Sequence, residues 1–265
     1  YTPHPRIAGI SLYHYECAES SQLPFRPIEN GQDVYFMQWP SSWGLALEKS
    51  MWQGFRTWLE EMGSKSPSQQ TKDSSTDQDQ FAFVTPWLPQ YVQSWESGSW
   101  KRLFVAYLRA KDLLFVYPRT SLSTHFGEPG PHTVLKGFQH SPLLTTEKNW
   151  SWSTPEDSLA IYDAWFELFP DQLQKLQPDL KGFDLSVDLY GTKESEALTS
   201  DFVLTSRWVP KELHTQADIV PRRYSMDLLP VVQNVISNLP GFDLFLIRRE
   251  KLDPQPAAIR HYLGK

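Results

Sequence analysis

The sequence has little of what marks several common classes of protein. Cysteine occurs once, as Cys17, so one copy of the chain holds no internal disulfide, which fits a reducing compartment such as the cytoplasm. No apolar run approaches the roughly 20 residues of a membrane-spanning helix, so we expect no transmembrane segment. The 25 Lys and Arg residues against 31 Asp and Glu leave a net charge of −6 and no basic stripe, so nucleic acid is not an expected partner.

The short motifs of several common enzyme classes are absent as well. The chain contains neither G-x-x-x-x-G-K-[ST] nor G-x-G-x-x-G, and neither H-E-x-x-H nor G-x-S-x-G. No cysteine and histidine spacing suits a zinc site. These absences remove support for P-loop enzymes, dinucleotide-dependent dehydrogenases, zinc proteases and hydrolases with a nucleophile elbow.

Aromatic residues are abundant, with 11 Trp, 11 Tyr and 15 Phe in 265 residues. A chain of this length can build the core of one large domain or two modest ones. Aromatic rings also make flat, amphipathic surfaces that suit sugars and nucleobases, although ordinary packing accounts for most of them.

The hydrophobic patterns predict a mixed α/β fold. Short apolar runs predict strands, and apolar residues at three- and four-residue spacing predict helices. The predicted strands are 7–13, 33–39, 113–117, 183–190, 202–206 and 242–248, and the predicted helices are 42–63, 97–110 and 156–169. Ser99 is the expected N-cap of the second helix, and Gly63 is placed to end the first.

The order of these elements divides the chain into two parts. Residues 1–140 are expected to form a mixed sheet flanked by helices, interrupted by a polar, flexible insertion at 64–80. Residues 141–265 are expected to form a helix and a small β-rich region. Within the latter, FDLSVDLY at 183–190 alternates strictly, which predicts a half-buried strand.

Three local patterns have residues suited to chemistry. The first is SSWGLALEKSMW (41–52). Its Gly44 would let the backbone approach a ligand closely, and Trp43, beside Ser42, would stack on a sugar or base. A helix start with a buried Trp explains the same sequence equally well. Asp184 and Asp188 share the polar face of the strand at 183–190 and would suit an acid/base pair, but a solvated face or pairing with Lys or Arg is the commoner arrangement.

The third pattern is RTSLSTHFGEPGPHT (119–133), which directly follows the apolar strand 113–117. Gly127 and Gly130 permit positive φ, and the prolines between and after them stiffen the turns. His132 could be presented to a metal or a phosphate, although a lone histidine is more often structural.

The order and spacing of these patterns resemble glycosyltransferases of the GT-A fold. The resemblance covers about residues 7–135 and rests on GISLY, DVYFMQW, SSWG and the 119–133 loop, and it is to the second half of the catalytic domain in family 2-like enzymes. It implies transfer of a sugar from a nucleotide-sugar donor to a carbohydrate acceptor, assisted by Mn²⁺ or Mg²⁺ and with inversion.

The resemblance also implies roles for individual residues. Ser42, Trp43 and Gly44 would bind substrate, and Arg119, His125, Gly127 and Gly130 would belong to a loop over the donor diphosphate, with His132 near the metal. Many relatives have Asn at the position of His125. Relatives often carry an Asp base at the start of the helix predicted over 97–110, where this chain has Lys101 and Arg102, which would instead contact phosphate. Glu96 is the nearest candidate base, and a retaining mechanism or a weakened enzyme stays open.

Relatives place their acidic metal motif before the region where this chain starts. We therefore expect a fragment, since Asp77 and Asp79 form a D-x-D only within the polar insertion and are not assigned to metal. Two further interpretations remain open: a non-catalytic glycan-binding or scaffolding module, and a subunit completed by another chain in an oligomer.

Overall fold

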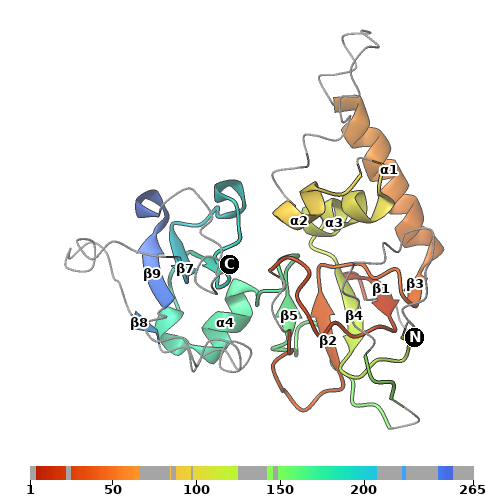
Figure 1. The fold of residues 1–265 in the computed structure, drawn as a ribbon, viewed down its shortest axis with the longest axis horizontal. Coiled ribbons are helices and arrows are strands. Elements are labelled where there is room, and N and C mark those ends of the chain that lie inside the picture. The colour runs from red at the N-terminus through yellow and green to blue at the C-terminus, as the bar shows by residue number, and fades with distance from the viewer. Residues whose placement is uncertain are drawn as a thin grey trace, which may run out of the picture.

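The computed structural model describes residues 4–21, 25–65, 84, 88–96, 98–124, 142–145, 149–207, 223–224 and 244–252. These residues form two mixed sheets with helices packed against them (Figure 1). The α/β fold class predicted from the sequence is confirmed. Within the described ranges, no helix is both long and apolar enough to cross a membrane.

The first sheet has five strands in the order β3-β1-β4-β2-β5. Its strands are β1 (Ile7–Ser11), β2 (Val34–Met37), β3 (Leu45–Leu47), β4 (Leu114–Pro118) and β5 (Ile161–Tyr162). Because β1 and β4 are parallel neighbours, their carboxyl ends lie at one edge of the sheet, which we call the carboxyl edge. β3 and β2 run antiparallel to them and begin at the same edge.

Helices α1 (Lys49–Lys65), α2 (Gln90–Gln93) and α3 (Trp100–Ala110) lie on one side of this sheet (Figure 1). Side chains of β4 alternate between the two faces, so Phe115 and Tyr117 join the helix-side core while Val116 packs on the opposite face. The predicted N-cap of α3 is confirmed, since the backbone N–H of Arg102 donates to the Ser99 hydroxyl.

The second sheet has four strands in the order β6-β7-β9-β8. They are β6 (Leu185–Asp188), β7 (Phe202–Thr205), β8 (Arg223–Tyr224) and β9 (Leu244–Arg248), preceded by α4 (Pro170–Leu176). Short 3₁₀ helices occur at Pro178–Leu180, Ser195–Ala197 and Arg249–Lys251. Leu185 and Leu204 belong to the same apolar cluster as Tyr117, so the two sheets share one core.

The predicted helix over 42–63 is wrong at both ends. Gly44 has a φ of 71°, and the next three residues pair with β1 as β3, so the helix begins only at Lys49. It then passes Gly63 and ends at Lys65, inside the stretch expected to be an insertion. The remainder of that insertion, 66–80, lies outside the described residues.

The predicted helix over 156–169 is also wrong, because this stretch contains β5 and a turn. The Asp163 carboxylate accepts the backbone N–H groups of Trp165 and Glu167 at 2.8 and 3.1 Å, and Phe166 has a φ of 65°. Ala164 and Leu168 are buried as expected. The spacing therefore indicated burial correctly, but a side-chain-stabilised turn produces it.

The strand predicted over 183–190 is shorter and more buried than expected. β6 spans four residues, all of them buried, so it is not the half-buried strand that the alternation indicated. Asp188 is 0% exposed, whereas Asp184 precedes the strand and is exposed. The two carboxylates consequently do not face a common solvent-exposed surface.

Candidate functional site

Three loop segments meet at the carboxyl edge of the first sheet: 11–14 after β1, 41–44 before β3 and 119–124 after β4. Each contains a buried serine that bonds to the backbone two residues further on. Backbone N–H groups of Tyr13 and Trp43 donate to the hydroxyls of Ser11 and Ser41 at 3.1 and 3.2 Å. The Ser121 hydroxyl donates to the carbonyl of Ser123 at 2.7 Å. Serine turns of this kind tighten all three segments.

Backbone hydrogen bonds join the three segments to one another. Leu12 donates to the carbonyl of Gly44 at 2.9 Å, and its own carbonyl accepts from Leu122 at 2.7 Å and from Ser123 at 3.1 Å. The His14 N–H donates to the Ser121 hydroxyl at 2.8 Å. SSWG and the beginning of the 119–133 loop, which the sequence assigned to one site, thus lie side by side.

Gly44 cannot be replaced by a larger residue without strain in this arrangement. Its φ of 71° is rare for residues with a side chain, and an added Cβ would lie 2.7 Å from the Leu12 Cβ and 3.0 Å from the Ser123 Oγ. A close backbone approach occurs here, but the atoms approached belong to the neighbouring loops. A ligand contact at Gly44 stays a prediction.

Ser42 and Trp43 present the polar and aromatic groups of this turn. Ser42 is exposed, and Trp43 is half-buried with its ring edge-on to Tyr13 at 4.6 Å between centroids. A fixed indole beside an exposed hydroxyl can contact both the apolar face and the hydroxyl groups of a sugar.

His14 is a residue of this edge that the sequence reasoning missed. Burial lowers the pKa of His14 to about 4, so the ring is neutral at physiological pH. Its Nδ1 has no hydrogen-bond partner among the described residues. Its position directly after the predicted strand 7–13 is the signal that could have found it.

Lys101 and Arg102 have internal contacts. The Lys101 ammonium lies 4.9 Å from the ring centroids of both Trp39 and Trp95, and 3.7 Å from a carboxylate oxygen of Glu19. Burial lowers the pKa of Lys101, with Glu19 opposing that shift. Arg102 is 2% exposed. These contacts favour packing roles over the phosphate contact expected from the sequence.

Arg119 holds the loop before β2. Its guanidinium donates to the carbonyls of Gln32 at 2.7 Å, Pro27 at 3.0 Å and Ile28, and to the side-chain oxygen of Asn30 at 2.8 Å. With these N–H groups engaged inside the protein, Arg119 is a structural residue of the carboxyl edge. The substrate contact expected for it stays untested and is disfavoured by this geometry.

Of the remaining predicted site residues, Glu96 alone is described, and no described contact brings it to the carboxyl edge. Glu96 is exposed in the turn between α2 and α3, where its carbonyl accepts the N–H of Ser99 at 2.9 Å. His125, Gly127, Gly130 and His132 lie outside the described residues.

The described residues do not fit the divalent metal that the resemblance implies. No group of three or more His, Cys, Asp or Glu side chains among them could hold a metal ion. Hard divalent cations such as Mn²⁺ and Mg²⁺ need several oxygen ligands. Mn²⁺ or Mg²⁺ is therefore not assigned to any described residue.

Comparison of the chain with protein-family models, curated proteins and solved structures found no match.

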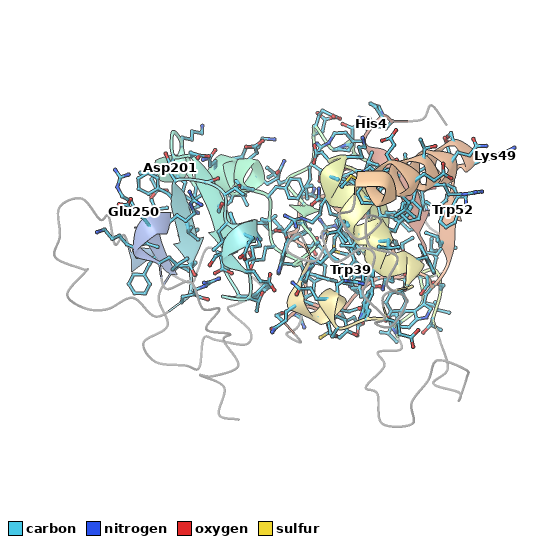
Figure 2. All side chains as sticks on the ribbon, turned by 90° about the horizontal axis from the view of Figure 1, so that it is seen from above. His4, Trp39, Lys49, Trp52, Asp201 and Glu250 are labelled. Atoms are coloured by element: carbon cyan, nitrogen blue, oxygen red, sulfur yellow. The ribbon has the colours of Figure 1, made fainter. Side chains whose placement is uncertain are left out.

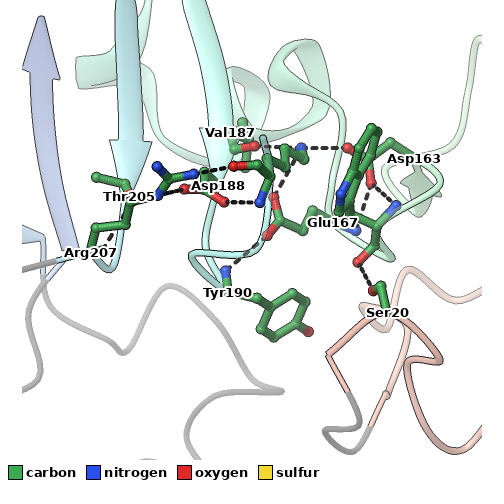
Figure 3. Close-up of polar contacts among 10 residues, drawn as sticks. Ser20, Asp163, Glu167, Val187, Asp188, Tyr190, Thr205 and Arg207 are labelled. Carbon is green, nitrogen blue, oxygen red and sulfur yellow. Dashed lines mark hydrogen bonds and ion pairs between the residues drawn. The ribbon is translucent and has the colours of Figure 1, made fainter. Parts of the chain in front are cut away.

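A cluster of ionisable side chains, separate from the carboxyl edge, lies between the two sheets (Figure 3). The Lys193 ammonium contacts the carboxylates of Asp163 at 2.5 Å and Glu167 at 3.0 Å, and the Arg207 guanidinium contacts Asp188 at 2.6 Å. Burial raises the pKa of Glu167 to about 8, although Lys193 opposes this shift.

This cluster is closed to substrate. Glu167, Asp188 and Arg207 are at most 1% exposed, and the Asp188 carboxylate also accepts the Thr205 hydroxyl at 3.1 Å. Of the explanations given for Asp188 by the sequence, pairing with a cation is therefore confirmed, and a solvated face is wrong because the side chain is 0% exposed. The cluster links β6 and β7 to the turn after β5 and has a structural role.

Proposed function

We propose that this chain is the acceptor-side part of an inverting glycosyltransferase that uses a nucleotide-sugar donor and a carbohydrate acceptor. The observation that carries the proposal is the meeting of SSWG with the start of the 119–133 loop at the carboxyl edge. Ligands of α/β sheets bind in the crevice outside the carboxyl ends of parallel strands. Here those ends belong to β1 and β4.

In the proposed reaction, an acceptor hydroxyl attacks the anomeric carbon of the donor sugar. The new glycosidic bond forms as the bond to the diphosphate breaks, and the nucleoside diphosphate leaves with the electron pair. A base takes the hydroxyl proton. Glu96 is the candidate named from the sequence.

Trp43 and Ser42 would orient a sugar in this reaction. The indole of Trp43 is fixed by the Ser41 turn and by Tyr13, and a rigid ring loses little freedom when a sugar stacks on it.

The test is release of nucleoside diphosphate by the gene product that contains this chain. The purified protein is incubated with UDP- and GDP-sugars, Mn²⁺ and neutral oligosaccharides, with EDTA in parallel. The proposal expects release that depends on one donor and on an acceptor. Absence of acceptor-dependent release with every donor would contradict it, and full activity after His132→Ala would remove the loop histidine from the site.

A non-catalytic glycan-binding module is the second candidate. It is favoured by the internal contacts of Lys101 and Arg119 and by the lack of a metal-binding cluster in the described part of the chain. Calorimetry separates the two candidates, because a transferase binds UDP or GDP, whereas the module binds oligosaccharides alone.

A further inference from the structure

Trp152 is the most exposed tryptophan among the described residues, with 61% of its surface open to solvent. Its ring is stacked on that of Trp150, with 5.4 Å between centroids and 25° between planes. Trp150 is partly buried and packs against the apolar cluster of Val34, Phe36 and Leu114 on the sheet face opposite the helices. The outer ring is therefore supported from behind by an inner ring that is itself anchored in the fold.

The backbone between the two rings is fixed by three hydrogen bonds. Asp33 donates its N–H to the carbonyl of Ser151 at 2.8 Å, and the Ser151 N–H donates to the Asp33 carboxylate at 2.8 Å. The Ser151 hydroxyl donates to the side-chain oxygen of Gln32 at 3.1 Å. A ring held this way is preorganised, so a ligand that stacks on it orders few additional groups.

The same hydrogen bonds tie the Trp150–Trp152 pair to the carboxyl edge. Asp33 directly precedes β2, whose first residue, Val34, pairs with the last residue of β4, Pro118. The N–H of Arg119 donates to the Asp33 carbonyl at 2.9 Å. The segment that carries Trp152 is therefore linked, through Asp33, to Arg119 at the start of the 119–133 loop.

The chemistry beside Trp152 favours an uncharged, hydroxylated ligand over an anionic one. An indole face matches the apolar C–H face of a pyranose ring, and the neighbouring polar side chains, Gln32, Ser151 and the Asp33 carboxylate, carry no positive charge. A nucleic acid would need cations around the ring, but the guanidinium of nearby Arg119 donates to protein oxygens and the chain carries a net charge of −6.

We propose that Trp152, backed by Trp150, is a carbohydrate-stacking subsite that binds one pyranose unit of a neutral glycan. The identification of this glycan as the acceptor of a sugar transfer rests on the proposed function. The binding of a sugar by Trp152 is proposed independently of it.

The experiment measures binding of mannotriose, cellotriose and chitotriose to the gene product by calorimetry, without a donor. Trp152→Ala removes the stacking face, Trp152→Phe retains a ring, and Trp52→Ala is the matched control. Trp52 is a surface tryptophan on α1 and is 38% exposed (Figure 2). Because Trp152 is exposed, its replacement leaves the core intact, and circular dichroism checks the fold of each variant.

We expect at least one trisaccharide to bind, with affinity reduced about tenfold or more in Trp152→Ala and much less in Trp152→Phe. Trp52→Ala should bind like the parent protein. No binding of any trisaccharide, or equal binding by Trp152→Ala, would overturn the subsite.

Titration of the same samples with UDP and GDP tests the proposed transferase function separately from the proposed sugar subsite. Trp152-dependent sugar binding without nucleotide binding would remove the proposed transfer and retain the subsite. Nucleotide binding with Trp152-independent sugar binding would do the reverse.

Discussion

Glycine is needed at individual positions of this chain for two separate reasons, a positive φ and the close approach of neighbouring atoms. Gly31 has a φ of 75° and open space around it, whereas Gly9 is crowded, with the Ala46 carbonyl 2.6 Å from an added Cβ. Gly44 combines both conditions at the carboxyl edge. Comparing the three sites therefore separates backbone strain from steric exclusion.

Replacement of Gly44 by Ala should destabilise the protein more than the same change at Gly31. We expect a loss of roughly 1 kcal/mol for Gly31→Ala, from φ alone, and roughly 2–4 kcal/mol for Gly44→Ala, where overlap with Leu12 adds to it. Urea denaturation at constant pH gives both values. Equal losses at the two sites would show that the loops around Gly44 can separate without cost.

Sequence reasoning identified some residues of the edge, whereas the contacts of others depend on the fold. Gly44 stood out because a glycine after Ser-Ser-Trp signals a special turn. Arg119 was assigned to substrate through the resemblance, and its observed partners lie far away in the chain, at Pro27 and Gln32, where no local pattern connects them. The same holds for Lys101, since Trp39 and Glu19 reach it only through the fold. The substrate contacts expected for both residues stay predictions.

At the scale of elements, the ionic cluster fastens the second sheet to the turn after β5. Lys193, which follows β6, contacts Asp163 at 2.5 Å and Glu167 at 3.0 Å, and it also donates to the carbonyl of Val187 at 2.5 Å. Removing one partner of a buried ion pair leaves an uncompensated charge, and this costs far more than losing an exposed pair.

Lys193→Met should therefore destabilise the protein by about 3–5 kcal/mol. Lys175→Met on the exposed side of α4 is the control and should change stability by less than about 0.5 kcal/mol. Thermal and urea unfolding of both variants would measure the difference. A small effect at Lys193 would mean that the cluster does not join the two sheets.

Stability should also depend on pH through Glu167. Burial raises its pKa from an ordinary value of 4.5 to about 8, so the folded protein keeps a proton that the unfolded chain releases. Stability therefore falls as pH rises from about 4.5 to 8.

The Glu167→Gln variant should show a smaller decline than the parent in urea titrations across this range. Glu250→Gln, at an exposed position, should retain the parental slope. Identical pH dependence of stability in the parent and in Glu167→Gln would show that the proton kept on folding is bound by another group.

Element predictions succeeded where local pattern decides and failed where distant contacts do. The cores of β1, β2, β4, β7 and β9 and the capped helix α3 were found, because apolar runs and a Ser N-cap are local signals. β3 was missed because its three residues form a strand only by pairing with β1. The turn at Asp163 and Phe166 was mistaken for helix because its buried residues happen to follow helical spacing.

At the scale of the whole molecule, the two sheets share one core, and the proposed chemistry lies at one edge of the first. The order of strands was not predictable from the sequence, because β5 joins the first sheet from beyond residue 140, across the boundary expected between the two parts. What the sequence did predict is that SSWG and the 119–133 loop belong to one site, and their hydrogen-bonded contact at the carboxyl edge is the basis of the functional proposal.

The most direct test of that proposal compares acceptor-dependent release of nucleoside diphosphate in the parent protein, Trp43→Ala and Trp52→Ala. The two tryptophans differ in place: Trp43 lies at the carboxyl edge against Tyr13, and Trp52 lies on α1. The account predicts release by the parent and by Trp52→Ala, and a loss of about tenfold or more in kcat/KM for Trp43→Ala, equal to at least 1.4 kcal/mol of transition-state stabilisation. Equal release by all three proteins would contradict the placement of the site, and no release by the parent with any donor would contradict sugar transfer itself.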